Sequence, residues 1–397
     1  MNIDNIKTPA YVIDEKKLRE NLEILDRVQK ESGARILLAQ KAYSVYQTYP
    51  LIAKYLSGAT ASGLYEARLA YEEMRTFNQD GNRKIENHVY EPAFGDEEMV
   101  EICDICDHLV FNSLAQLEHH RPVWEKKVKE GKLSVGLRIN PEYSTQEEHE
   151  IYDPCSEGSR LGISNANMPD ILPEGVEGIH FHTLCEQGFE PLKETFRHVE
   201  KEFARFFPDP ESSDNSGKIK WINLGGGHHI TREDYNVEGL IKFVKDIKEK
   251  YGIEVYLEPG EAIALDAGYL ITTIMDVVKT PRMPVLILDT SAACHMPDVL
   301  EMPYRPPLRG GEEPGELPFT YRLSSRTCLA GDVIGDYSFD HELNIGDRLV
   351  FEDMAIYSMV KNNTFNGMPL PDIDILHENG DVEVIKRFSY SDFKERL

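Results

Sequence analysis

Short apolar runs alternate with stretches of helical period between residues 36 and 257. Most of the runs lack polar alternation, as expected of parallel strands that are buried on both faces. The predicted strands are residues 36–40, 59–62, 88–90, 109–111, 135–139, 176–182, 221–224 and 255–257. The main helical stretches between them are residues 46–56, 65–76, 114–128, 192–206 and 238–251. Eight strands that alternate with helices predict an α/β fold, a parallel (β/α)8 TIM barrel.

The pattern changes after residue 264, where β-rich segments such as PVLILD and RLVFEDMAIY are separated by Pro and Gly turns. These segments predict a second, mostly β domain of sandwich-like or barrel-like form. We therefore expect a barrel domain at residues 14–264 and a β-rich C-terminal domain at residues 265–397. A strand at residues 8–13 is expected to join the β-rich domain.

The composition narrows the classes of partner. The net charge of −26, from 43 basic and 69 acidic residues, argues against binding to nucleic acid or to an anionic membrane surface and favours cationic ligands. No run approaches the ~20 apolar residues of a membrane span. The start, MNIDNIKTPAYVIDEKK, lacks the basic and apolar regions of a secretory signal. Six scattered cysteines fit a reducing compartment. We therefore expect a cytoplasmic protein.

Two groups of residues raise the question of a metal site. Cys103 and Cys106 have CxxC spacing, but no second CxxC or spaced His pair accompanies them. Their segment, DEEMVEICDICDHLV, has the period of an amphipathic helix, so we expect both thiols to be buried core groups. His180 and His182 would share one face of a strand. A zinc pair completed by Cys185 and by His228 or His229 is one interpretation, although no HExxH pattern is present.

Polar residues follow several predicted strands at the rim where barrel enzymes build their sites. Lys41 ends the first strand; it is either a surface lysine or an amine at the barrel mouth. Gly225, Gly226 and Gly227 follow the seventh strand and either close a turn or offer backbone N–H groups to a phosphate. Glu258 follows the eighth strand and either caps a helix or pairs with a cationic ring nitrogen.

The remaining candidates are a histidine and a thiol. His182, at a strand end, could lie against an aromatic ring, whereas His180 is expected to be a hydrogen-bonded core residue. Cys328 stands in a turn-rich context, where a lone cysteine is usually inert packing. An amine, a phosphate loop, a carboxylate for a ring nitrogen and a stacking histidine together meet the needs of pyridoxal 5'-phosphate. We therefore predict this cofactor, with Lys41 forming the imine and no metal.

A resemblance adds to this hypothesis. The strings AQKA, ASGLYEARLA, HFHT, NLGGGHH, EPGE and CLAGD resemble the alanine-racemase-like pyridoxal-phosphate decarboxylases, which include the ornithine and diaminopimelate enzymes. The longer strings DTSAACHMPDVLEMPYRPPL and FEDMAIYSMVKNNTFNGMPLPDI resemble the carboxynorspermidine/carboxyspermidine decarboxylases within that group. The resemblance runs nearly from end to end of the chain.

The resemblance implies a role for each matching residue. Lys41 would be the Schiff-base lysine, and Cys328 would donate a proton to the product carbanion. The residues implied to bind or order the cofactor are Glu66, Arg138, His182, Gly225, Gly226, Gly227, Glu258 and Tyr357. The group forms homodimers with shared sites, so Cys328 and Asp332 are expected to serve Lys41 of the partner subunit, with Asp332 binding the substrate there.

Three positions depart from the ornithine-type pattern. Thr60 stands where an acid is common, and Leu329 follows Cys328 where an acid is expected. Glu261 replaces an arginine that normally helps to bind phosphate. The first two departures weaken an ornithine assignment. The third supplies an extra acid near the mouth, and Glu261 with Asp298 would suit a substrate that carries distal amines. Asp298 alone could equally be a turn residue.

The expected reaction is decarboxylation of carboxynorspermidine or carboxyspermidine, giving norspermidine or spermidine in polyamine biosynthesis. The two substrates differ by one methylene, worth only ~1–3 kcal/mol of discrimination, and the sequence does not separate them. A diaminopimelate decarboxylase is the first alternative, although its distal carboxylate would call for a cation rather than Glu261 and Asp298. The second alternative is a non-enzymatic pyridoxal-phosphate binder, against which the second domain and its CLAGD string argue.

Overall fold

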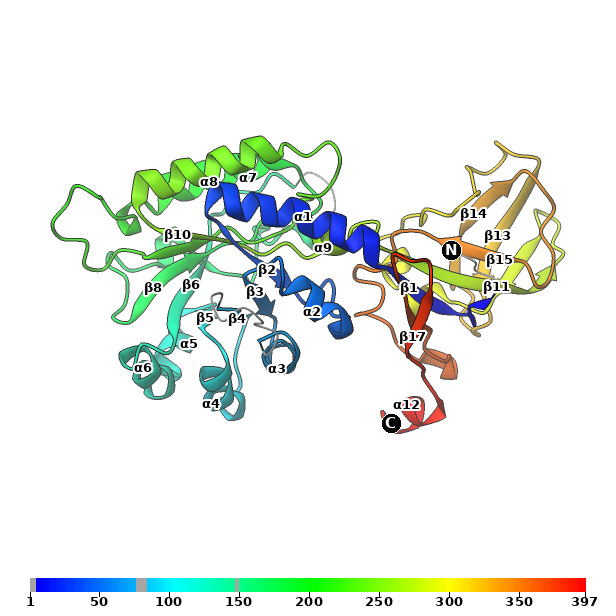
Figure 1. Cartoon of the computed structure of the whole chain (residues 1–397), viewed down its shortest axis with the longest axis horizontal. Helices are drawn as coiled ribbons and strands as arrows, with labels where there is room; N and C mark the ends of the chain where they lie inside the picture. Colours follow the sequence, from blue (N-terminus) through cyan, green and yellow to red (C-terminus); the bar gives the residue numbers. More distant parts are fainter. Residues whose placement is uncertain (1–4, 76–83, 147–149) are drawn as a thin grey trace. The chain divides into compact units, whose positions relative to one another are not determined.

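The computed structural model describes residues 5–75, 84–146 and 150–397 (Figure 1). Contacts within the chain separate two compact units. One unit is Asn21–Ile263, and the other combines Met1–Glu20 with Ala264–Leu397. Each helix of the described ranges is too short or too polar to cross a membrane.

The unit Asn21–Ile263 contains a closed parallel barrel. Each strand pairs in parallel with the next, and β10 pairs with β2 to close the circle. The eight barrel strands found among the described residues are β2 (Arg35–Ala39), β3 (Gly58–Ala61), β4 (Glu86–Glu91), β5 (His108–Phe111), β6 (Ser134–Asn140), β8 (Val176–His180), β9 (Trp221–Asn223) and β10 (Glu254–Leu257). The short strand β7 (Ile163–Ser164) pairs with β6. The predicted TIM barrel is confirmed.

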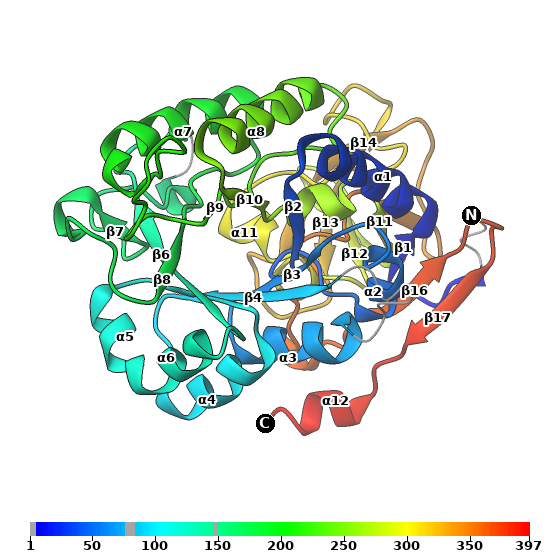
Figure 2. The ribbon, with the colours of Figure 1, turned by 60° about the vertical axis from the view of Figure 1, so that its left-hand side comes forward.

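Helices surround these strands on the outside, as Figure 2 shows for α3 to α8. The helices of this part of the chain are α1 (Glu15–Ser32), α2 (Tyr49–Ile52), α3 (Leu64–Glu73), α4 (Asp96–Ile105), α5 (Leu114–His119), α6 (Arg121–Lys129), α7 (Phe189–Glu202), α8 (Val237–Tyr251) and α9 (Glu261–Ala264). The predicted helix at residues 114–128 is divided into α5 and α6, because Pro122 lies in the first turn of α6 and cannot continue a preceding helix. Short 3-10 turns complete the connections: η2 (Tyr46–Thr48), η4 (Glu150–Tyr152), η5 (Asn165–Asn167) and η6 (Ala204–Phe206).

Large rings fill the interior of the barrel. His88 and His108 stack with ring centroids 4.0 Å apart, and Tyr256 and Trp221 pack against them. A Cβ at Gly178 would lie 2.1 Å from the Trp221 ring, so this strand position must be glycine for the indole to fit. The lower barrel is therefore packed solid, and chemistry is confined to its mouth.

The second unit is a mixed β-sheet domain. Its strands are β1 (Ala10–Asp14), β11 (Gly268–Val278), β12 (Val285–Leu288), β13 (Phe319–Ser325), β14 (Val333–Phe339), β15 (Arg348–Phe351), β16 (Asp372–Leu376) and β17 (Val382–Lys386). They follow the order β14-β13-β12-β11-β1-β16-β17, with β15 beside β11. Short helical turns lie between strands or after them: α10 (Ala292–His295), α11 (Asp298–Glu301), η7 (Phe365–Gly367) and α12 (Tyr390–Lys394).

The N-terminal strand β1 is central to this sheet. It pairs antiparallel with β11 and parallel with β16. Its residue Tyr11 belongs to the main core cluster of the unit, together with Leu270, Phe351 and Tyr337. The expected mostly β second domain is confirmed, and the N-terminal segment supplies one of its inner strands.

The two cysteines with CxxC spacing lie in the barrel's outer layer. Cys103 is in α4 and Cys106 follows its end; both are free and buried. Burial raises the pKa of Cys103 to about 12 and raises that of Cys106 further. Neither belongs to a group of side chains that could hold a metal within the described ranges. They are packing residues, as predicted.

One carboxyl group in the sheet domain is buried in a way that lowers the stability of the folded state when it is ionised. Asp374 of β16 is 2% exposed, and its Oδ1 has no hydrogen-bond partner among the described residues. Burial, together with the charge of Asp372, raises its pKa to about 6. Because the folded pKa lies above the ordinary value of 3.8, ionisation disfavours the folded state. Stability should fall as pH rises toward about 6 and stay low above it.

The variant Asp374→Asn should therefore be more stable than the wild type at neutral and alkaline pH. We expect a gain of about 2 kcal/mol, or a few degrees in Tm, that shrinks as the pH falls below about 6. Thermal unfolding of both proteins across this pH range measures the gain. The exposed Asp340→Asn serves as the control and should show no such pH-dependent gain. An equal Tm difference at all pH values would contradict the assignment.

Candidate cofactor site at the barrel mouth

The residues singled out in the barrel domain gather at the carboxyl ends of its strands. Lys41 follows β2, His182 follows β8, and Glu258 follows β10. Glu66 lies in the first turn of α3, where its Oε2 accepts a hydrogen bond of 2.6 Å from Ser62 N–H. Parallel strands place these ends at one rim, so the residues meet although they are far apart in sequence.

Lys41 lies beside His182, whose ring is held by the glycine loop (Gly225, Gly226 and Gly227). Nδ1 of His182 accepts a hydrogen bond of 2.9 Å from Gly226 N–H. A neutral imidazole with an accepting Nδ1 carries its proton on Nε2. That nitrogen lies 3.5 Å from Lys41 Nζ. The ring therefore presents a donor to the lysine, which suits an amine with a free electron pair.

The electrostatics of the mouth favour the same neutral state. Solvent reaches Lys41, yet crowding by protein atoms lowers the pKa of its amine, and the charge of Arg138 lowers it further. Burial also lowers the pKa of His182 well below its ordinary value, reinforced by the charges of Lys41 and Arg138. A lysine with a lowered pKa is a better nucleophile toward an aldehyde at neutral pH.

Glu258 is the second reactive group of the mouth. Its Oε2 lies 3.0 Å from His180 Nε2, and its Oε1 accepts a hydrogen bond of 2.7 Å from Asn223. Burial alone would raise the pKa of Glu258, but His180 and Asn223 stabilise the carboxylate and lower it. Glu258 is therefore ionised at neutral pH. His180, expected to be a hydrogen-bonded core residue, is buried and orients this acid.

The glycine loop fits only because its residues lack side chains. A Cβ at Gly226 would lie 2.1 Å from Glu258 O, and one at Gly227 would lie 1.8 Å from Leu184 O. Gly225 and Gly227 also have positive φ angles of 71° and 80°. The loop is thus wedged between the segments that follow β8 and β10.

The N–H groups of this loop are not equivalent. Gly225 N–H donates to Asn223 Oδ1 at 2.9 Å, and Gly226 N–H donates to His182. In the part of the chain that the structure describes, Gly227 N–H has no acceptor. Gly227 is thus the member of the triplet whose N–H is open to a ligand.

Arg138 of β6 is buried beside these residues. It donates a hydrogen bond of 3.1 Å to His182 O and lies 4.6 Å from the centre of the Tyr90 ring. Arg138 thus fixes the backbone at His182, and its role toward the cofactor stays a prediction. The zinc interpretation of His180 and His182, completed by Cys185 and by His228 or His229, finds no support. Among the described residues these side chains form no group that could hold a metal.

Glu261 does not offer a free carboxylate. Its Oε2 lies 2.7 Å from Nε2 of His229, and both side chains are largely buried. Burial by itself lowers the pKa of His229, but the contact with Glu261 outweighs burial and raises it. The two groups therefore form an ion pair, and Glu261 is not an uncompensated acid for a distal amine.

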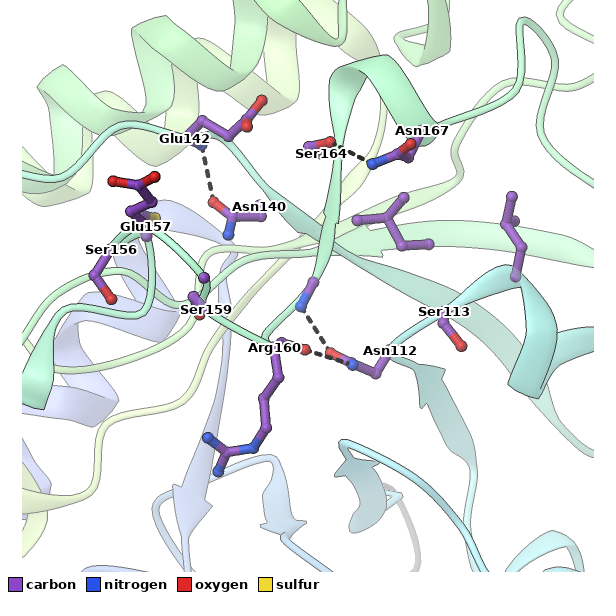
Figure 3. A pocket seen from close by; sticks show the side chains of 15 residues that line it. Asn112, Ser113, Asn140, Glu142, Ser156, Glu157, Ser159, Arg160, Ser164 and Asn167 are labelled. Carbon is purple, nitrogen blue, oxygen red and sulfur yellow. Dashed lines mark hydrogen bonds between the residues drawn. The ribbon is translucent and has the colours of Figure 1, made fainter.

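A separate pocket of about 730 Å³ adjoins the ends of β5 and β6 (Figure 3). Asn112 connects two segments of its wall: it donates a hydrogen bond of 2.8 Å to Arg160 O and accepts one of 2.7 Å from Gly162 N–H. Glu142 and Glu157 give the pocket acidic groups. None of the predicted site residues lines it.

Cys328 and Asp332 belong to the sheet domain, in the loop between β13 and β14. The Cys328 side chain is exposed, and its N–H donates to Asn366 Oδ1 at 2.6 Å. Asp332 is instead 1% exposed. Its carboxylate accepts hydrogen bonds from Ser291, Ala293 N–H, Ser325 and Thr327. Asp332 is thus fully occupied in holding the loop, which does not suit the predicted contact with substrate.

Asp298 and Tyr357 also lie in the sheet domain. Lys361 Nζ is held by the Asp298 carboxylate and by Glu301 Oε2, the latter at 3.2 Å. Tyr357 has a positive φ of 53°, and Lys361 Nζ lies 5.9 Å from the centre of its ring. Asp298 is therefore part of a carboxylate pair that already binds an alkylammonium group.

The sequence assigned no role to Asn223, and none to His229 outside the zinc interpretation. Asn223 fixes both Glu258 and Gly225, and His229 pairs with Glu261. Both lie in the NLGGGHH string, so their position in a rim motif was the available signal. Their partners come from other strands, which the spacing along the chain does not reveal.

Comparison with known proteins agrees with this geometry. The family described as "Pyridoxal-dependent decarboxylase, C-terminal sheet domain" matches residues 10–355. The chain belongs to the pyridoxal-dependent decarboxylases. As a member of this family it is a carboxy-lyase whose cofactor is pyridoxal phosphate.

Full-length relatives narrow the comparison. The chain is 40% identical to a carboxynorspermidine/carboxyspermidine decarboxylase of Campylobacter jejuni, with 100% of both chains covered. It is 38% identical to a carboxyaminopropylagmatine decarboxylase of Synechocystis, covering 100% of this chain and 96% of that one. A crystal structure of Campylobacter jejuni carboxynorspermidine decarboxylase complexed with norspermidine superposes with a TM-score of 0.87 at 38% identity, covering 99% and 100%.

The decarboxylase has the donor set that its cofactor needs. The glycine loop is a cradle that any Cβ would fill, and Gly227 N–H is open toward a ligand. Lys41 is held next to His182, and Glu258 is an ionised carboxylate at the same rim. These groups match the aldehyde, ring and phosphate of pyridoxal phosphate.

The variant Gly227→Ala tests the cradle. Its Cβ would collide with Leu184 O, and its φ of 80° costs about 1–3 kcal/mol for a residue with a side chain. We expect cofactor affinity to fall at least about tenfold, as measured by absorbance titration. Gly131→Ala is the matched control, because Gly131 also has a positive φ but no atom within 4 Å of its Cβ position. Equal cofactor affinity in the two variants would contradict the loop's role.

Proposed function

We propose that the decarboxylase removes the carboxyl group of carboxynorspermidine or carboxyspermidine and releases norspermidine or spermidine for polyamine biosynthesis. The observation that carries the proposal is a rim that joins Lys41 and Glu258 in a chain 40% identical over its full length to a decarboxylase of these substrates. The negative net charge of −26 suits a polycationic substrate.

The bound cofactor supplies an aldehyde for the substrate's amine and a ring that accepts the electron pair left by departing CO2. We assign its attachment to Lys41 and contact with its ring face to His182. To the Glu258 carboxylate we assign the task of holding a proton on the ring nitrogen; its ionised state, kept by His180 and Asn223, supports this role. Gly227 N–H binds the phosphate.

The other roles implied by the resemblance are proposed with adjustments. Glu66 and Tyr357 complete the cofactor contacts, and Arg138 orders the His182 segment. Cys328 delivers a proton to the product carbon from an exposed loop, and Asp332 fixes that loop rather than contacting substrate.

We further propose that the enzyme is a cytoplasmic homodimer, in which Cys328 acts at Lys41 of the partner subunit. In this proposal residues 14–264 form the cofactor-binding domain, and residues 265–397 with residues 8–13 form the second domain. The match to the Campylobacter relative across both domains supports this two-domain enzyme.

The distal ammonium of the substrate requires acids. Asp298 and Glu301 already hold the ammonium of Lys361, which shows that this pair has the right spacing for an alkylammonium group. We propose that the substrate's distal ammonium takes the place of Lys361 there. Glu261, paired with His229, is less suited to this contact than Asp298.

Two other substrates deserve comparison. The first is carboxyaminopropylagmatine, the substrate in the name of the Synechocystis relative, which carries a guanidinium group in place of an ammonium. Diaminopimelate carries a distal carboxylate, which the acids Asp298 and Glu301 would repel. A non-enzymatic cofactor binder would show no turnover of any of these substrates.

The decisive test is CO2 release from a substrate panel with cofactor absorbance recorded alongside. We expect kcat/KM for carboxynorspermidine or carboxyspermidine to exceed that for carboxyaminopropylagmatine and diaminopimelate by about tenfold or more. Lys41→Ala should lose both the visible absorbance of the bound cofactor and turnover. A higher kcat/KM for diaminopimelate, or turnover by Lys41→Ala at the wild-type rate, would overturn the proposal.

A second experiment tests the distal subsite. Asp298→Asn should raise KM for the polyamine substrate about tenfold with a smaller change in kcat, because a charge-assisted hydrogen bond to the ammonium is lost. Lys361→Met should not raise KM, since it removes the competing ammonium. Asp336→Asn is the control, because Asp336 pairs with Arg322 elsewhere in the same unit. If Asp298→Asn and Asp336→Asn have the same KM, the subsite is wrongly placed.

A further inference from the structure

The pair of Glu261 and His229 connects two segments of the barrel mouth. His229 lies two residues after Gly227, and Glu261 is the first residue of α9. The segments also touch through their backbones, because Gly226 packs against the Glu258 carbonyl. The pair therefore lies beside the loop whose open N–H is assigned to phosphate.

A carboxylate at this place is a problem for phosphate binding. A phosphate monoester carries about −1.5 to −2 charges at neutral pH and is repelled by a nearby acid. A protonated His229 cancels the charge of Glu261, whereas a neutral His229 would leave the acid unopposed. The 2.7 Å contact between His229 Nε2 and Glu261 Oε2 favours the protonated ring.

We propose that Glu261 is a positioning residue for His229, and that the protonated His229 ring balances the charge of Glu261 beside the cofactor's phosphate. The charged state of this pair thereby controls phosphate affinity. The proposal uses the family's cofactor but does not depend on which substrate is decarboxylated.

Other charged groups around His229 do not remove the need for this pairing. The titratable and charged neighbours of its ring are Glu261, Glu186, Arg232, Asp234 and His228. Glu186 favours the protonated ring and Arg232 opposes it, but Arg232 is itself paired with Asp234. Burial keeps His228 neutral by lowering its pKa to about 3. Glu261 is thus the neighbour in direct contact that sets the charge of His229.

The test measures how much the phosphate group adds to binding. Full-length protein freed of cofactor is titrated with pyridoxine 5'-phosphate and with pyridoxine, which lack the aldehyde and so cannot react with Lys41. The Kd of pyridoxine divided by the Kd of pyridoxine 5'-phosphate gives the ratio that isolates the contribution of the phosphate to binding. In the wild type this ratio should fall as the pH rises above neutral, since the phosphate stays ionised while His229, whose pKa is raised, loses its proton.

Three variants make the prediction specific. His229→Gln leaves Glu261 unopposed, so the ratio should drop about tenfold near neutral pH. Glu261→Gln removes the acid, so the ratio should stay near the wild-type value and lose its alkaline fall. The double variant His229→Gln/Glu261→Gln should recover the ratio to within about twofold of the wild type.

A purely structural pair would behave differently. Each variant would then bind both ligands with equally reduced affinity and the ratio would not change, which would overturn the proposal. A double variant with a ratio as low as that of His229→Gln would also overturn it. Thermal unfolding checks that each variant folds; if His229→Gln does not fold, the pH profile of Glu261→Gln decides. Failure of the substrate panel would leave this ratio measurable, so the two proposals fail separately.

Discussion

The hydrogen bond from Gly226 N–H to Nδ1 of His182 sets the state of the barrel mouth. It exists because residue 226 has no Cβ, which would otherwise strike the Glu258 carbonyl. By occupying Nδ1, the bond leaves the ring proton on Nε2, toward Lys41. One backbone contact therefore couples the shape of the glycine loop, the tautomer of the His182 ring and the protonation of the Lys41 amine.

Two acids at this rim are each held by a histidine, but with opposite electrostatic results. Burial lowers the pKa of His180, so this ring donates a hydrogen bond while it stays neutral, and the charge of Glu258 survives. The pKa of His229 is raised by its contact with Glu261, so that second carboxylate is cancelled. The site thus keeps its negative charge at the place assigned to a ring nitrogen and removes it near the place assigned to a phosphate.

The barrel strands and the candidate site residues that follow them were predictable from the sequence, because they depend on burial and on where each strand ends. The run Ile36–Ala39 lies in a parallel strand because it is apolar on both faces, and Lys41 marks its end. Contacts between remote segments were not predictable. Glu261 and His229 are 32 positions apart, and their pairing depends on how β9 and β10 lie side by side. Glu261 therefore resembled a free acid in the sequence, although the fold gives it a partner.

The CLAGD string shows the same limit in the sheet domain. Cys328 and Asp332 resemble two reactive groups of one motif, yet the thiol is exposed and the carboxylate is buried. Contact between Asp332 and a substrate would break several hydrogen bonds, each worth about 1 kcal/mol net and more when the acceptor is charged. These bonds hold Thr327, which directly precedes Cys328 in the chain, and Ser325, two residues before Thr327. The structure therefore favours different roles for the two residues, in which Asp332 fixes the position of the loop that carries Cys328.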